Sequence, residues 1–173
     1  TSTVEITYVI KTIRAFVATP YIDENRGYIS PTGVFLYPEG YLNRPIVVDI
    51  RPFHKWKNIA TGLDTTEQSN VFNATDYDEL YDCPILIGNL EELPPFTVSG
   101  IPHRFIGYNI GEFDKLQFVN DLKKIVETGS AIIGHIPYKQ YTFIGIGPGA
   151  GGIEHANSTT ISFNGSGLGT PQG

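Results

Sequence analysis

A short segment late in the chain combines bare backbone with a single carboxylate. A glycine pair, Gly151-Gly152, is followed by Ile153, Glu154 and His155, and then by a stretch rich in Ser and Thr. An exposed strand edge can pair with an extended peptide through main-chain hydrogen bonds. A carboxylate at the end of that edge can bind a peptide's terminal ammonium through a charge-assisted hydrogen bond. This spacing predicts a site that selects peptides by their free N-terminus, although no residue set in the chain is arranged to cleave one.

Two other interpretations of the same region compete with this one. Glu154 could be an ordinary exposed strand carboxylate. Residues 147–152 also contain a formal G-x-G-x-x-G after a strand, which is the dinucleotide-binding pattern. That pattern needs a helix to begin there, so that its N-terminus meets the pyrophosphate. Residues 159–163 are β-formers instead, and Pro148 lacks an N–H donor, so a nucleotide site is not expected.

No other cluster has the spacing of a catalytic or metal site. The four histidines, at 54, 103, 135 and 155, form no H-x-x-x-H pair, so we expect no zinc site within this chain. Cys83 is the only cysteine, which excludes an internal disulfide. The acidic run from Asp76 to Asp82 has the residue types of a glycosidase pair, but a solvated loop is the simpler interpretation.

Composition restricts the class of protein. With 173 residues, 40% of them hydrophobic and 17% charged, the chain is long enough to bury a core and reads as globular. A net charge of −6 with scattered Lys and Arg argues against a nucleic-acid surface. No apolar run approaches the roughly 20 residues that a membrane-spanning helix needs. The sequence therefore predicts a soluble protein.

The pattern of elements predicts two domains, and the fold class is mainly β with an α+β part. Apolar segments at 4–10, 13–18 and 46–50, separated by turn residues about every ten positions, predict an incomplete β-sandwich over residues 1–94. The second domain, residues 95–173, begins after Glu91-Glu92-Leu93-Pro94-Pro95. Its only helix is expected from Asp114 to about Ile133, stopping at Gly134. Strands are expected at 96–99, 104–109, 141–146 and 153–163.

Several segments resemble, in order, the glycyl aminopeptidase family of zinc metallopeptidases, a relative of aminopeptidase N in the thermolysin-like clan. The shared segments cover most of the chain, and the last is the most specific: residues 56–63, 72–85, 100–104, 136–138 and 151–159. The resemblance implies a bacterial protein with a β-sandwich followed by the first lobe of a thermolysin-like catalytic domain. Its compartment, cytoplasm or periplasm, stays open.

The same resemblance gives roles to the glycine-rich segment. Gly151 and Gly152 would pair with the backbone of a peptide substrate, and Glu154 would bind its α-ammonium. His155 stands where the clan has Asn, and it could either orient Glu154 or face the sandwich. The implied reaction is removal of N-terminal Gly or another small residue from peptides.

The family's zinc-binding H-E-x-x-H helix does not occur in this sequence. The resemblance therefore implies a piece of a longer protein, with that motif shortly after Gly173 and further sandwich strands before Thr1. Zn²⁺ and the remainder of the catalytic domain would belong to the parent protein, while this chain alone would bind no zinc and be inactive. Two alternatives are a non-enzymatic β-sandwich interaction module and, less favoured, a sugar-binding sandwich using Trp56 and the Tyr-rich loops, although Trp56 is better interpreted as a core residue.

Overall fold

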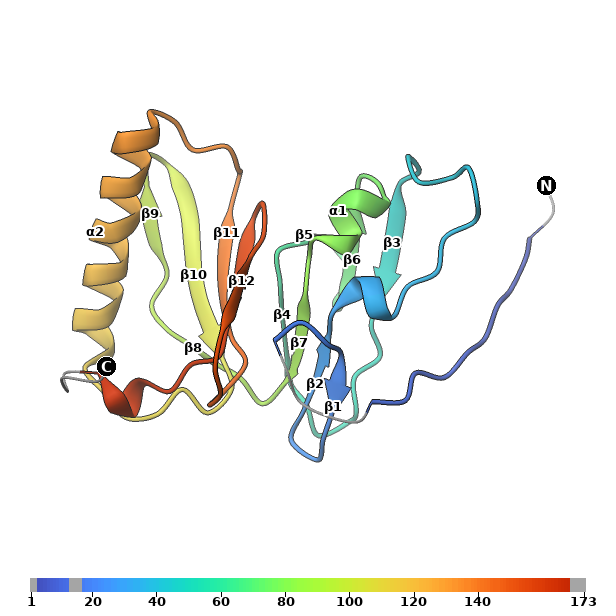
Figure 1. Ribbon diagram of the computed structural model, residues 1–173, viewed down its shortest axis with the longest axis horizontal. Coiled ribbons are helices and arrows are strands. Elements are labelled where there is room, and N and C mark those ends of the chain that lie inside the picture. Colours follow the sequence, from blue (N-terminus) through green and yellow to red (C-terminus); the bar gives the residue numbers. More distant parts are fainter. Residues whose placement is uncertain (1–2, 13–16, 169–173) are drawn as a thin grey trace.

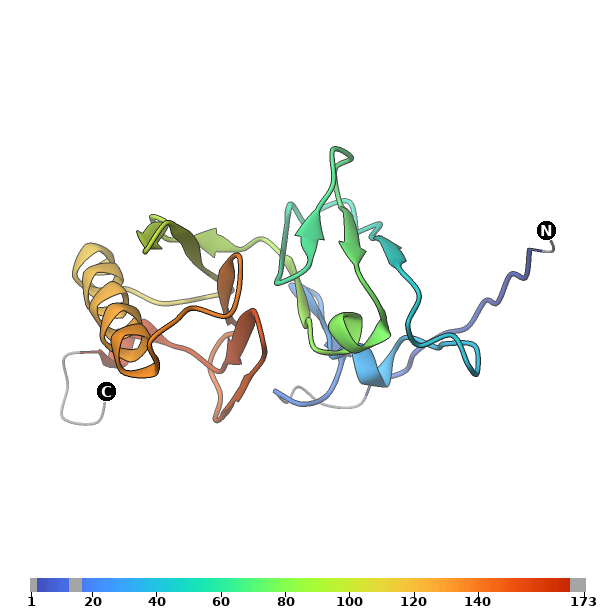
Figure 2. The ribbon, with the colours of Figure 1, turned by 90° about the horizontal axis from the view of Figure 1, so that it is seen from above.

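A computed structural model describes residues 3–12 and 17–168. It consists of three layers: helix α2, a six-stranded sheet, and a group of smaller sheets from the first half of the chain (Figure 1). The view from above shows α2 and the first-half sheets on opposite sides of the six-stranded sheet (Figure 2). The predicted fold class, mainly β with sandwich-like sheets and few helices, is confirmed.

The first half of the chain, called here the N-terminal domain, contains two small antiparallel sheets. The first has the order β1-β2-β7-β4: β1 (Tyr21–Ile22), β2 (Arg26–Ile29), β7 (Ile85–Gly88) and β4 (Asn58–Thr61). The second has the order β3-β6-β5: β3 (Ile46–Asp49), β6 (Val71–Ala74) and β5 (Asp64–Thr65). A 3₁₀ turn, η1 (Pro31–Gly33), and a short helix, α1 (Tyr77–Tyr81), complete the domain.

The second half, called here the C-terminal lobe, forms the six-stranded sheet in the order β12-β13-β11-β10-β8, with β9 also pairing with β10. Its strands are β8 (Glu91–Glu92), β9 (Phe96–Val98), β10 (Ile101–Gly107), β11 (Tyr141–Gly145), β12 (Gly152–Glu154) and β13 (Ser158–Ile161). Helix α2 (Lys115–Ile133) connects the parallel strands β10 and β11, and η2 (Gly165–Gly167) follows β13. The predicted domain division at residue 94 stays a prediction.

Side chains alternate along β7 and β10, so each of these strands packs on both faces of its sheet. In β7, Ile85 and Ile87 face a core within the N-terminal domain, while Leu86 faces the C-terminal lobe. In β10, Ile106 packs against the N-terminal domain, whereas Phe105 packs toward α2. The six-stranded sheet is therefore covered on one face by α2 and on the other by the N-terminal domain.

The predicted helix and its caps are confirmed. Asp114 is the N-cap, and its carboxylate accepts a hydrogen bond from the N–H of Gln117 at 2.9 Å. Gly134 ends the helix with φ +90°, a left-handed conformation that glycine adopts without strain. No helix within the described residues has the length and apolar run needed to span a bilayer.

Some predicted strands are wrong. Residues 4–10 alternate as a strand should, yet they pair with no other described strand, because β-propensity yields a strand only where a partner edge is present. The strand predicted at 13–18 falls largely outside the described residues. The strand predicted at 153–163 is two antiparallel strands, β12 and β13, joined by a turn.

Two further interpretations are corrected or decided. The acidic run is not simply a solvated loop, because it contains α1, whose N-cap Asp76 accepts a hydrogen bond from the N–H of Glu79 at 2.9 Å. Trp56 is buried, with 9% of its surface exposed, and packs in the core of the N-terminal domain. A ring this buried offers no open face to a sugar, so Trp56 has the core position that the sequence favours for it.

Candidate functional site

Strand β12 carries the predicted site and forms an edge of the six-stranded sheet. It pairs only with β13 among the described strands, with Gly152 opposite Ile161 and Glu154 opposite Thr159. Gly151, directly before the strand, has φ +94°, which is strained for any residue with a side chain. The glycine pair therefore lies at an open sheet edge.

The hydrogen-bond pattern shows which backbone groups are available at this edge. Ser162 donates to the carbonyl of Gly151 at 3.0 Å, and His155 donates to the carbonyl of Ser158 at 2.9 Å. Inward and outward pairing alternate along an antiparallel strand, so the N–H and C=O groups of Gly152 and Glu154 point away from β13. Those two residues, rather than Gly151, present their backbone to an added strand.

The side chains of β12 alternate between the two faces of the sheet. Ile153 packs against the core shared with the N-terminal domain. Glu154 lies on the other face, beside its register partner Thr159. Its side chain is exposed and makes no hydrogen bond or ion pair with any other residue that the structure describes. It is therefore not committed to a structural ion pair.

Tyr141, on β11, bonds to β13, the strand between it and β12. Its hydroxyl donates to the carbonyl of Ser158 at 2.8 Å and also contacts the hydroxyl of Thr159. Burial raises the pKa of Tyr141 above its usual value, the bond to Thr159 lowers it, and the negative charges of Glu154 and Asp82 raise it further. Tyr141 is therefore a neutral hydrogen-bonding group at physiological pH.

The three residues after Glu154 contact the N-terminal domain. His155 Nδ1 and the N–H of Ala156 both bond to the carboxylate of Asp82, at 3.0 and 2.7 Å. Asn157 donates to the carbonyl of Gly62 at 3.0 Å and accepts from the Cys83 thiol at 3.4 Å. Of the two orientations left open for His155, the structure shows the one that faces the sandwich.

Sequence reasoning missed Asp82 and Gly62 as parts of this region. Asp82 belongs to the acidic run interpreted as a loop, although the Asp76-x-x-Glu79 spacing is a signal for a helix start. That helix ends at Asp82, its C-cap, which places the carboxylate at the interface. A Cβ atom on Gly62 would overlap Asn157 Oδ1, so glycine at this position lets the Asn157 side chain approach closely. No local pattern identifies such a contact.

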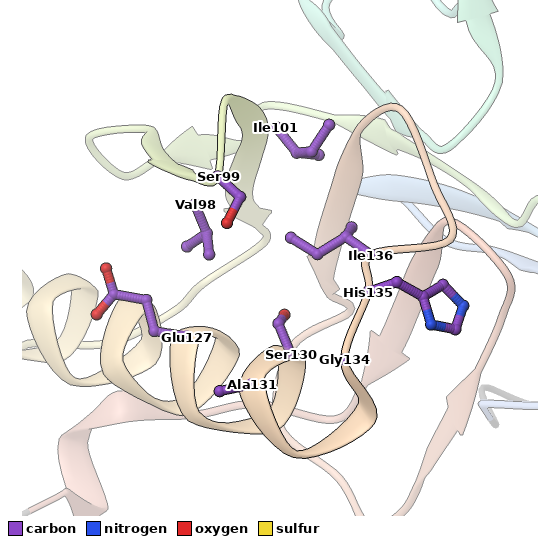
Figure 3. Close-up of a pocket in the computed structure, with 9 residues that line it drawn as sticks. All are labelled: Val98, Ser99, Ile101, Glu127, Ser130, Ala131, Gly134, His135 and Ile136. Carbon is purple, nitrogen blue, oxygen red and sulfur yellow. The ribbon is translucent and has the colours of Figure 1, made fainter.

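A hollow with a volume of about 610 Å³ lies away from β12, between α2 and the β9–β10 hairpin. Figure 3 shows Val98, Ser99 and Ile136 around it, while the imidazole of His135 points away from its centre. Glu127 is the only carboxylate along its wall. With the imidazole of His135 turned away, no acid–base pair among the described residues faces the hollow, so it does not have the character of a catalytic site.

No group of three or more His, Cys, Asp or Glu side chains that could hold a metal ion occurs in the described parts of the chain. These residues therefore do not fit a zinc site. His103, which is fully buried, is engaged by the carbonyl of Ile101 at 2.9 Å and the hydroxyl of Tyr138 at 3.0 Å. Burial lowers the pKa of His103, which favours the neutral ring.

Comparisons with known proteins identify the family to which the chain belongs. Residues 1–89, more than half of the chain, match the model of the Peptidase M61 N-terminal domain. The chain belongs to the peptidase M61 family. No curated protein matches it.

Solved structures extend the likeness into the C-terminal lobe. An aminopeptidase N family protein from Idiomarina loihiensis is 33% identical over 82% of this chain, with a TM-score of 0.73. An M1 zinc metallopeptidase from Deinococcus radiodurans is 14% identical over 82% of this chain, with a TM-score of 0.50. A mutant of the M1 zinc metallopeptidase from the same organism, bound to a Tyr-Ser-Ala substrate, is 16% identical over 79%, also at 0.50.

The two Deinococcus structures share only the fold with this chain. The chain spans 25% of the Idiomarina protein and 37% and 35% of the other two. The general part of the predicted resemblance, to a peptidase family with the aminopeptidase fold, is thereby confirmed. The preference for glycine stays a prediction.

Proposed function

We propose that this chain is the peptide-recognition part of a zinc-dependent aminopeptidase that removes N-terminal Gly or another small residue. The observation that carries the proposal is Glu154: an exposed carboxylate without a partner among the described residues, on a sheet edge whose backbone points outward. Family membership supports a peptidase, and the resemblance to glycyl aminopeptidases supports the preference for small residues.

The binding step follows from this geometry. An extended peptide adds to the outer edge of β12 and pairs with the N–H and C=O groups of Gly152 and Glu154. Its α-ammonium forms a charge-assisted hydrogen bond with the carboxylate of Glu154. A peptide whose amine is blocked lacks that bond, so the site discriminates in favour of free N-termini. Gly151 shapes the entry to the edge through its left-handed backbone.

No H-E-x-x-H motif occurs in this sequence, so the proposal assigns the cleavage step to another part of the parent protein. Zinc, when bound by the parent protein, would supply an activated water for hydrolysis. The M1 relative from Deinococcus radiodurans is a zinc metallopeptidase, which supports the same cofactor in the parent. The part of this chain is to hold the ammonium and to align the peptide. By itself, the chain is expected to turn over no peptide.

Glu154→Ala in the whole protein tests the proposal. We expect kcat/KM for a glycyl substrate to fall about ten- to a hundredfold, the effect of losing a charge-assisted hydrogen bond to the ammonium. Zinc content, measured by metal analysis, should not change. Glu127→Ala, which removes an exposed carboxylate from α2, is the matched control and should leave kcat/KM as it is. Unchanged activity in Glu154→Ala would refute the role.

The second candidate, a non-enzymatic interaction module, has one observation in its favour. Val4, Ile6 and Val9 are 80%, 67% and 82% exposed on an extended segment that pairs with no other described strand. Such a segment is suited to adding to the sheet of a partner. Reading the gene beyond Gly173 separates the two: an H-E-x-x-H motif within a few dozen residues favours the enzyme, and a stop codon favours the module.

A further inference from the structure

We propose that Asp82 is a positioning residue for strand β12. It belongs to the N-terminal domain and holds the residues that follow Glu154, and in this way it places the carboxylate that binds the ammonium. This inference rests on the proposed role of Glu154. It gives the N-terminal domain a part in substrate selection, although that domain contributes no atom to the peptide edge of β12.

Both oxygens of Asp82 are used across the interface. Oδ1 accepts from His155 Nδ1 at 3.0 Å, and Oδ2 accepts from the N–H of Ala156 at 2.7 Å. Because an ionised carboxylate only accepts hydrogen bonds, His155 must carry a proton on Nδ1. The His155 side chain is 12% exposed and its Nε2 is buried without a partner in the described structure, so the ring has little freedom to turn.

Asp82 is itself held firmly. It is the C-cap of α1, and its N–H donates to the carbonyl of Asp78 at 3.1 Å. Leu80, two residues earlier, is 1% exposed and anchors the helix in the core of the N-terminal domain. A carboxylate on such a support acts as a fixed point for the chain that binds it.

Strand β12 needs a fixed point outside its own sheet. It has only three register pairs with β13 and no strand on its other side within the described chain. His155, Ala156 and Asn157 are consecutive, and each bonds to the N-terminal domain immediately after Glu154. Binding groups must be held close to their productive geometry to be effective. Loss of the Asp82 contact should therefore move Glu154 away from the position that the ammonium requires.

The test measures selectivity for the amine. Gly-Ala-Ala and acetyl-Ala-Ala differ only in the terminal ammonium, and both can compete with a chromogenic glycyl substrate of the whole protein. The ratio of their inhibition constants reports the ammonium contact alone. We expect Glu154→Ala to remove the selectivity and Asp82→Ala to lower it about tenfold, with KM for the glycyl substrate rising more than kcat falls.

Two variants separate positioning from a general effect on folding. Asp82→Asn should keep most of the selectivity, because its amide can still accept from Ala156 and donate to His155 in the other tautomer. Asp49→Ala, which removes a half-exposed carboxylate paired with Arg51 on the N-terminal domain, should leave it unchanged. If Asp82→Ala does not fold, His155→Ala removes the other partner of the same bond and should show the same loss.

A double-mutant cycle provides the sharpest outcome. Asp82→Ala combined with Glu154→Ala should be no less selective than Glu154→Ala alone, because both act on one contact. Selectivity within twofold of the wild type in Asp82→Ala and His155→Ala, with loss in Glu154→Ala, would overturn the positioning role only. An equal loss in Asp82→Asn and Asp82→Ala would also overturn it. Unchanged selectivity in Glu154→Ala would reject the proposed function itself.

Discussion

The centre and the edge of the six-stranded sheet are held in different ways. Strands β10 and β11 are parallel neighbours at the centre, and each contributes apolar side chains to the cores on both faces of the sheet. Strand β12 has an exposed glycine, an exposed carboxylate and one inward apolar residue, Ile153. The centre is held by its own burial of apolar surface, whereas the edge depends on polar contacts with another part of the chain. The edge is also where the proposed peptide site lies.

Removing a central aromatic side chain should have the largest effect on stability and little on recognition. Phe105 is 1% exposed and makes edge-to-face contacts with Phe118 and Phe163, at centroid distances of 5.2 and 5.0 Å. Phe105→Ala should lower the free energy of unfolding by about 3–5 kcal/mol, through lost burial and the cavity left behind. Chemical denaturation measures this change. A loss below about 1 kcal/mol would show that the centre is not held by its own core.

The same difference explains what can be predicted from the sequence. Helix α2 is predictable together with its caps, because Asp114 and Gln117 indicate its start and Gly134 indicates its end. Strand β11 is predictable to within one residue, because an apolar, β-branched run identifies it. These elements carry their signals in neighbouring residues, and the family resemblance agrees with them.

The hairpin at the edge could not be predicted in the same way. Residues 153–163 read as one strand, since no glycine, proline or Asn-Gly pair marks a turn between β12 and β13. The turn at 155–157 is instead stabilised by Asp82 and Gly62, which lie over 70 residues away. The sequence identifies Glu154 as a candidate because two glycines precede it. The contacts that hold its segment in place are tertiary, and no local pattern identifies them. Its proposed role remains a prediction.

Gly62→Ala should weaken the edge without touching β12. The added methyl group would overlap Asn157 Oδ1 and force the hairpin away from the N-terminal domain. We expect a loss of about 1–3 kcal/mol in the free energy of unfolding, as for other overpacked sites, together with lower selectivity for the amine. Asn157→Ala in the same background removes the overlap and should restore part of the stability. Equal stability of Gly62→Ala and wild type would contradict the close approach.

The smallest expected effect is a dependence on alkaline pH at the interface beside the hairpin. Cys83 is 1% exposed, and burial raises the pKa of its thiol to about 12 from an ordinary value near 9. Above pH 9 the unfolded chain releases this proton while the folded chain keeps it. Between pH 8 and 10, stability should therefore fall by at most about 1.4 kcal/mol for this one proton.

The difference between wild type and Cys83→Ala from pH 8 to 10 isolates the thiol. Buried tyrosines such as Tyr28, whose pKa burial raises to about 12, also lose protons in the unfolded chain as the pH approaches 10, but they do so in both proteins. Cys83→Ala should flatten the fall in unfolding free energy over this range, since it removes the proton that the two states hold differently. Asn157→Ala, which removes the acceptor of the thiol hydrogen bond but keeps the thiol, should retain the fall. If the unfolding free energy of the wild type does not change up to pH 10, the thiol is not buried at the interface. The hairpin would then be held less closely against the N-terminal domain than its hydrogen bonds require.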